Sequence, residues 1–309
     1  MFSPGGEGFF MVELGMAIET HLETVPTGEW EELLVALGEE GGTALFLGPT
    51  DVGKSTLVHW LVGRLAKSGA GVALVDADVG QSSLCLPGTV GAKFFLHATD
   101  VREYACARLA FLGSPNPARI VFHLVEMAGH FAQEARREAD LVLVDTTGLV
   151  AGEIGVGLKL AKIRATGADR VIALQRRGEC EPILGRLRNA VIHRLAPSPL
   201  ARVRSQETRT RRRAERLTRY FAEACTEFLI RADEAEFIRF GRDVSLRNTP
   251  LEAGTIIGLN RGKETMALGA VTEADGDGIS FRSPLRALRE INRVVLGEMR
   301  EDREPYDEG

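Results

Sequence analysis

Nine consecutive residues carry the clearest chemical signal in the chain. Residues 48–56 read Gly-Pro-Thr-Asp-Val-Gly-Lys-Ser-Thr and fit the phosphate-binding pattern GxxxxGK[ST]. In this pattern the glycines let the backbone turn its N–H groups toward phosphate oxygens, and the N-terminus of the following helix adds partial positive charge. We therefore assign the binding of a nucleoside triphosphate to Gly48, Pro49, Thr50, Asp51, Val52, Gly53, Lys54, Ser55 and Thr56.

Side chains in and near this loop have separate expected tasks. Lys54 is expected to contact the β- and γ-phosphates, Ser55 to coordinate Mg²⁺, and Thr56 to hydrogen-bond a phosphate oxygen. Asp145 ends an apolar run, where P-loop proteins usually place the carboxylate that holds Mg²⁺ or one of its waters. The alternative for Asp145 is a helix N-cap.

Short apolar runs separated by helical periodicity surround these residues. The runs cover residues 44–47, 71–75, 141–144 and 170–174. Such alternation predicts an α/β fold, a doubly wound parallel sheet of the P-loop NTPase class. Ligands of these sheets bind beyond the carboxyl ends of the strands, so residues 48–56, 76–78 and 145–148 should converge.

The pattern also predicts how the chain is organised. Residues 1–40 indicate a short lead-in, and residues 41–230 a P-loop domain with an arginine-rich helical lid. From residue 231 to 309, short strands punctuated by glycines indicate a small β-rich domain, which we expect to end in a closing helix from Pro284.

The amino-acid composition argues against several classes of protein. A hydrophobic content of 44% over 309 residues supplies a core, and a net charge of −5 argues against indiscriminate binding to polyanions. The four cysteines are far apart without a CxxC pair, so we expect no zinc site, no disulfide staple and a reducing, cytoplasmic setting. No apolar stretch is long enough to span a bilayer, which predicts a soluble protein with no membrane partner.

Further motifs indicate the acceptor of the phosphate. Residues 75–83 read Val-Asp-Ala-Asp-Val-Gly-Gln-Ser-Ser, residues 111–117 read Phe-Leu-Gly-Ser-Pro-Asn-Pro, and Asp-Thr-Thr-Gly-Leu follows at 145–149. With the P-loop and residues 204–209, they resemble the polynucleotide 5′-hydroxyl kinase family over about residues 43–222. That family includes the kinase subunit of the eukaryotic pre-mRNA cleavage and tRNA-splicing machinery, nucleolar rRNA-processing kinases, and archaeal and bacterial relatives.

The resemblance implies roles for the acceptor residues. Asp78 matches the family's catalytic aspartate, which activates the hydroxyl, whereas Asp76 is interpreted as structural. Gln81 is expected to hydrogen-bond the acceptor end or a water bound to the triphosphate. The alternatives from the residues alone are a turn-forming aspartate at Asp78, because Gly80 follows it, and a solvated glutamine at Gln81.

Thr147, Gly148 and Leu149 match the family's clasp, the element that contacts the nucleic-acid end. Many eukaryotic members carry tryptophan where this chain has Leu149. Since stacking a base on an aromatic ring contributes roughly 1–3 kcal/mol, leucine predicts a weaker grip on the terminal base.

Arginines gather near residue 209. Arg209, Arg213 and Arg216 are spaced i, i+4 and i+7, which places them on one helical face, and Arg204 precedes the helix. The resemblance to the family's lid implies that Arg209 and Arg213 act on the transferring phosphoryl group and that Arg204 and Arg216 bind nucleic acid. The alternative is a solvated basic helix, which we favour for Arg202, Arg211, Arg212 and Arg219.

The resemblance therefore implies a Mg²⁺-dependent enzyme that transfers the γ-phosphate of ATP, or another nucleoside triphosphate, to the 5′-hydroxyl end of RNA or DNA. One alternative is a regulatory or assembly NTPase, because Asp145-x-x-Gly148 also imitates the switch motif of GTPases, although no Asn-Lys-x-Asp guanine reader follows. Another is a scaffold that holds nucleotide in RNA processing. The sequence leaves open whether RNA or DNA is the acceptor, which triphosphate is preferred and what the oligomeric state is.

Overall fold

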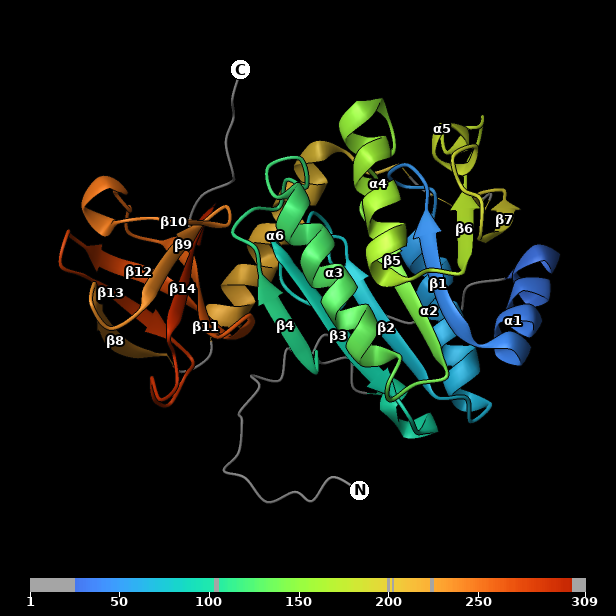
Figure 1. Cartoon of the computed structure of the whole chain (residues 1–309). Helices are drawn as coiled ribbons and strands as arrows, with labels where there is room; N and C mark the ends of the chain where they lie inside the picture. The colour runs from blue at the N-terminus through green and yellow to red at the C-terminus, as the bar shows by residue number, and fades with distance from the viewer. Residues whose placement is uncertain (1–25, 103–105, 199–200, 202, 223–224, 302–309) are drawn as a thin grey trace.

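The computed structural model describes residues 26–102, 106–198, 201, 203–222 and 225–301. Figure 1 shows a sheet flanked by helices beside a second, β-rich part formed by the C-terminal portion of the chain. The helices are α1 (Gly28–Glu40), α2 (Lys54–Lys67), α3 (Val121–Ala135), α4 (Gly152–Thr166), α5 (Glu181–Leu184) and α6 (Gln206–Phe221). Within the described residues, none of the helices is both long and apolar enough to cross a bilayer.

The first sheet confirms the doubly wound α/β prediction. Its strands run in the order β4 (Arg108–Phe111), β3 (Thr89–Phe95), β2 (Val72–Ala77), β5 (Leu141–Thr146), β1 (Gly42–Leu47), β6 (Arg170–Leu174) and β7 (Val191–Leu195). From β2 to β7 all neighbours are parallel, and β3 and β4 form an antiparallel edge. The four predicted apolar runs are β1, β2, β5 and β6; the patterning had not indicated β3, β4 or β7.

Alternating side chains of the central strands fill two cores. Val75 and Val144 belong to the core shared with α3 and α4, which cover one face of the sheet in Figure 1. Leu74 and Leu143 belong to the core shared with α1 and α2 on the opposite face. Consecutive residues of these strands are hydrophobic because helices cover both faces of the sheet.

The second sheet runs in the order β10 (Arg242–Asp243), β9 (Glu236–Arg239), β14 (Arg293–Arg300), β11 (Thr255–Arg261), β12 (Glu264–Ala274), β13 (Gly278–Ser283) and β8 (Thr226–Arg231). It lies beside β4, where the Phe111 N–H donates to Thr265 Oγ1 at 2.8 Å. The predicted boundary at residue 231 falls inside β8, which pairs with β13.

The predicted closing helix is wrong. Residues 293–300 form β14, which pairs with β11 on one side and β9 on the other. The spacing of Leu285, Leu288 and Ile291 imitates a helix, but these residues belong to an irregular segment and pack against the core of the second sheet. The period of three over so few residues does not distinguish a helix from a packed loop.

The expectation of no disulfide is also wrong. Cys85 and Cys106 are bonded, with their Cα atoms 6.2 Å apart, although they lie 21 residues apart in sequence. The antiparallel β3 and β4 fold the chain back on itself, and a Cβ added to Gly91 of β3 would meet both sulfur atoms. Cysteine spacing alone does not reveal such a pair, and the cysteine-based argument for a reducing compartment is lost.

The C-terminal end of α6 is anchored to the second sheet. Leu217, Tyr220 and Phe221 are buried with residues of β11, β12 and β14. The Leu268 N–H donates to Tyr220 Oη at 2.8 Å, so the phenol satisfies a buried backbone donor.

Tyr220→Phe should therefore destabilise the protein by about 1–3 kcal/mol, because the buried Leu268 N–H loses its acceptor. Urea unfolding measures this loss. Thr218→Val, which removes a hydroxyl from the exposed side of the same helix, serves as the control. An unfolding midpoint for Tyr220→Phe equal to that of the control would contradict the assigned anchor.

Candidate active site

The loop between β1 and α2 has the backbone geometry that phosphate binding requires. Asp51 and Gly53 adopt left-handed φ values of 60° and 90°, and α2 starts at Lys54. The Lys54 ammonium is buried and donates to Gly48 O at 2.9 Å and Pro49 O at 2.8 Å. The lysine is thus held inside the curve of its own loop, where phosphate oxygens would be enclosed by backbone N–H groups.

Asp145 at the end of β5 faces the start of α2. The Ser55 hydroxyl donates to Asp145 Oδ2 at 2.6 Å. Burial raises the pKa of Asp145 to about 7, as do the charges of Asp76 and Asp78, while Lys54 and the Ser55 hydrogen bond oppose this rise. The two residues that the sequence analysis expects at the Mg²⁺ site are therefore joined by a hydrogen bond between their side-chain oxygens.

Asp76 holds the loop that follows β2. Its Oδ2 accepts hydrogen bonds from the Ser83 N–H at 2.6 Å, the Leu84 N–H at 2.8 Å and the Ser82 hydroxyl at 3.0 Å. Its Oδ1 accepts from the Asp78 N–H at 3.0 Å. A fully buried carboxylate with this many donors supports the structural interpretation of Asp76.

Asp78 is half-buried directly after the last residue of β2. Its Oδ1 accepts from the N–H groups of Gly80 at 3.1 Å and Gln81 at 3.0 Å, which closes the turn that the sequence offered as an alternative. Oδ2 takes no part in that turn. The Gln81 side chain donates to the Gly80 carbonyl at 2.9 Å.

The lid helix α6 starts behind the N-cap Ser205, whose Oγ accepts from the Thr208 N–H at 3.1 Å. Arg209 forms an ion pair with Asp51 of the P-loop at 2.5 Å, and the Arg204 N–H donates to the same carboxylate at 3.0 Å. The start of the lid is therefore held on the phosphate-binding loop.

Residues 48–223, which are more than half of the chain, match the mRNA cleavage and polyadenylation factor CLP1 P-loop family. The chain belongs to this family. Polyribonucleotide 5′-hydroxyl-kinases of Pyrococcus horikoshii and Methanocaldococcus jannaschii are 32% and 34% identical to it, over 58% and 57% of this chain and 49% of each relative. The polyribonucleotide 5′-hydroxyl-kinase Clp1 of Xenopus tropicalis is 32% identical over 60% of this chain and 45% of the relative.

The chain thus spans about half the length of the curated relatives it matches. Among solved structures, a chain of the wild-type Clp1p–Pcf11p complex superposes with a TM-score of 0.70 at 13% identity, covering 88% of this chain and 78% of that chain. At 13% identity, this structural similarity shows that the two chains share a fold and shows nothing more.

The remaining lid residues of this CLP1 P-loop chain make different contacts. Arg216 donates to the carbonyls of Ser82 and Ser83, so it binds the loop after Asp78, and burial lowers its pKa to about 10. Arg213 donates to Thr210 Oγ1 at 2.8 Å. Arg211, Arg212 and Arg219 are exposed, as a solvated face requires, and Arg202 lies outside the described residues.

The predicted clasp lies between the P-loop and the core. Thr147 is buried, and a Cβ added to Gly148 would lie 2.6 Å from the Thr50 backbone nitrogen, so this glycine touches the P-loop. Leu149 is half-buried and packs against the core between the sheet and helices α3 and α4. The Leu149 side chain is therefore partly a core residue. The comparison with the tryptophan of eukaryotic family members did not indicate this packing.

Two lysines that the sequence analysis did not select lie beneath the site. Lys159 and Lys162 of α4 are both 0% exposed. The Lys162 ammonium donates to Ala77 O at 2.9 Å, and the Lys159 ammonium donates to Thr146 Oγ1 at 2.7 Å and to the Thr147 carbonyl. In sequence they resemble solvated helix lysines; the only signal is that apolar residues flank each of them.

Burial is the main cause of altered pKa values for these lysines. It lowers the pKa of Lys162 to about 8, against the opposing pull of Asp78 and then Asp145. It lowers the pKa of Lys159 well below its usual range, with Lys162 and Lys54 adding to the effect.

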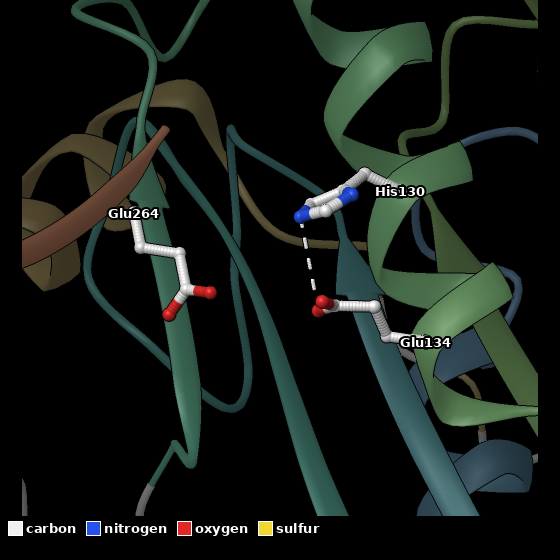
Figure 2. Close-up of side chains that lie close together, drawn as sticks. All are labelled: His130, Glu134 and Glu264. Carbon is white, nitrogen blue, oxygen red and sulfur yellow. Dashed lines mark ion pairs between the residues drawn. The ribbon is translucent and has the colours of Figure 1, made fainter. Parts of the chain in front are cut away.

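A separate cluster of His130, Glu134 and Glu264 lies between α3 and β12 (Figure 2). His130 Nε2 is 3.7 Å from Glu134 Oε2, and Glu264 pairs with Arg108 at 3.2 Å. The pair of His130 and Glu134 runs along α3, whereas Glu264 with Arg108 and the neighbouring pair of Lys263 with Glu126 at 2.7 Å link the second sheet to β4 and α3.

Gly148→Ala should weaken nucleotide binding, because the new Cβ would press on the backbone of Thr50 in the P-loop. The overpacking should also lower the free energy of unfolding by about 1–3 kcal/mol, which urea unfolding measures. Gly157→Ala on α4 is the matched control, since a Cβ there meets nothing within 4 Å. Isothermal titration with ATP checks the effect, and equal affinity of the two variants would contradict the assigned contact.

Proposed function

We propose that this chain transfers the γ-phosphate of ATP, or another nucleoside triphosphate, to the 5′-hydroxyl end of RNA or DNA. The observation that carries the proposal is the convergence of the P-loop, Asp78 and the lid residue Arg209 at one edge of the sheet. The names of the archaeal and Xenopus relatives support this acceptor class, and the polyribonucleotide in those names favours RNA.

In this proposal each segment has one task. The P-loop N–H groups and Lys54 hold the triphosphate, and Asp78 Oδ2 accepts the proton of the attacking 5′-hydroxyl. Arg209 leaves Asp51 for the phosphoryl oxygens, which compete for the same guanidinium. Gln81 and the clasp residues Thr147, Gly148 and Leu149 orient the acceptor end.

The residues at the phosphate end suit Mg²⁺. Ser55 Oγ and Asp145 Oδ2 are hard oxygen donors 2.6 Å apart, close enough to share one small cation or its waters. Asp145 is buried next to Asp76, and a cation would compensate this negative charge. When bound, Mg²⁺ would neutralise charge on the phosphates.

The contact of Gly148 with Thr50 favours a second candidate, a regulatory NTPase in which this glycine senses the γ-phosphate. A nucleotide-holding scaffold is the third. The intact Lys54, Ser55 and Asp78 argue against a scaffold, since these are the side chains to which the proposal assigns phosphate binding, Mg²⁺ and activation of the hydroxyl.

The direct test incubates the protein with γ-labelled ATP, Mg²⁺ and matched 5′-hydroxyl RNA and DNA oligonucleotides. We expect labelled 5′-phosphate ends. Nucleotide turnover that does not respond to either oligonucleotide and yields no labelled end would overturn the proposal in favour of the NTPase.

Asp78→Asn should reduce transfer by about 10²–10⁴-fold, because the amide cannot accept the proton, while triphosphate affinity stays unchanged. Lys54→Ala should reduce both transfer and triphosphate affinity. Single-turnover transfer and equilibrium titration with ATP separate the two effects. Wild-type transfer by Asp78→Asn would remove this residue from the proposed role.

Arg209→Ala should lower kcat by about tenfold or more, since a guanidinium on the transferring phosphoryl group is lost. Arg211→Ala is the control, because Arg211 is exposed and pairs along the helix surface with Glu215 at 3.5 Å. Steady-state kinetics on the same oligonucleotide measure the difference. If Arg209→Ala and Arg211→Ala behave alike, the lid contact is a solvated ion pair.

A further inference from the structure

Lysine is almost never fully buried unless it is paired, and α4 buries two lysine side chains one turn apart. Both ammonium groups lie beneath the carboxyl ends of β2 and β5, which lead into Asp78 and the clasp. Their cost in desolvation calls for a compensating task at this edge of the sheet.

Lys162 fixes the end of β2. Its ammonium donates at 2.9 Å to the carbonyl of Ala77, the residue directly before Asp78. That carbonyl belongs to the peptide unit joining the two residues, so the hydrogen bond restrains the point from which the Asp78 side chain departs. The charges of Asp76, Asp78 and Asp145 all act on Lys162, which places the ammonium among the acidic groups of the site.

Lys159 fixes the start of the clasp. Its ammonium donates to Thr146 Oγ1 at 2.7 Å, to Thr147 Oγ1 at 3.2 Å and to the Thr147 carbonyl. The Thr146 hydroxyl in turn donates to Phe46 O at 2.6 Å, near the end of the strand that enters the P-loop. Through Thr146, the same lysine is linked to both the clasp and the phosphate-binding strand.

We propose that Lys159 and Lys162 are positioning residues, which use one rigid helix to set the distance between Asp78, the clasp and the triphosphate. This inference rests on the proposed function and deepens it. In-line transfer requires the attacking hydroxyl and the phosphate to be placed within a fraction of an ångström, and a misplacement of about 1 Å can cost about 100-fold in rate.

A purely structural role for the lysines makes a different prediction. Loss of the buried hydrogen bonds would then lower stability, triphosphate affinity and transfer together. A positioning role lowers kcat for transfer while the dissociation constant for ATP, which is set by the P-loop, stays within about twofold of the wild type.

The test uses Lys159→Met and Lys162→Met, which keep the length of the aliphatic chain and remove the ammonium. Lys67→Met, at an exposed position of α2, is the matched control. We expect kcat to fall between tenfold and about 100-fold in both α4 variants and to stay unchanged in the control. Transfer at the wild-type rate, or a loss that only parallels the loss of ATP affinity, would overturn the proposal.

A second readout does not require transfer. Amide hydrogen exchange should accelerate at residues 77–83 in Lys162→Met and at residues 146–149 in Lys159→Met, with the rest of the sheet protected as in the wild type. If a methionine variant does not fold, glutamine at the same position (Lys159→Gln or Lys162→Gln), which keeps an N–H donor without the charge, takes its place in both measurements. Exchange that is unchanged at these segments, or accelerated throughout the sheet, would contradict a positioning role.

The two readouts separate this inference from the proposed function. If the wild type phosphorylates no oligonucleotide while exchange changes locally as expected, the proposed function fails and the lysines still position these segments. If the wild type transfers phosphate and the variants do so equally well, the proposed function stands and the lysine inference fails.

Discussion

The structure depends on keeping several carboxylates together at the ends of two neighbouring buried strands. Asp76 of β2 and Asp145 of β5 are partners in the parallel register, and Asp78 follows within two residues. Like charges this close, away from water, are unfavourable unless each is satisfied by donors or cations. Asp76 receives backbone N–H groups from its own loop, Asp145 receives the Ser55 hydroxyl, and Lys54 and Lys162 supply positive charge nearby.

The alternation of side chains along the strands divides this edge into two sides. Asp145 points to the face covered by α2, where it meets Ser55, and the next residue, Thr146, points to the opposite face, where it meets Lys159 of α4. One strand end therefore serves the phosphate side through one residue and the acceptor side through its neighbour. Because the period of a strand is two, a shift by a single residue would exchange these roles.

The features that could be predicted from the sequence are those that local patterns encode. The P-loop and the four central strands depend on short-range order and are found where expected, and Arg209 and Arg216 lie on one helix, as their spacing predicts. The bond between Cys85 and Cys106 depends on two antiparallel strands that were not predicted. Lys159 and Lys162 were missed because burial of a charged side chain follows from tertiary packing, which helical periodicity does not reveal.

The second sheet acquires a role from the way α6 is held. The end of that helix is fixed by apolar burial of Leu217, Tyr220 and Phe221, whereas its start is held by the ion pair of Arg209 with Asp51. Burial of apolar surface is not replaced by a charged ligand, but a phosphate oxygen offers a guanidinium the same kind of bond as a carboxylate does. In the proposed function, the start of α6 can therefore exchange its partner while the end stays in place. This requires a support outside the P-loop sheet, and β11, β12 and β14 provide it.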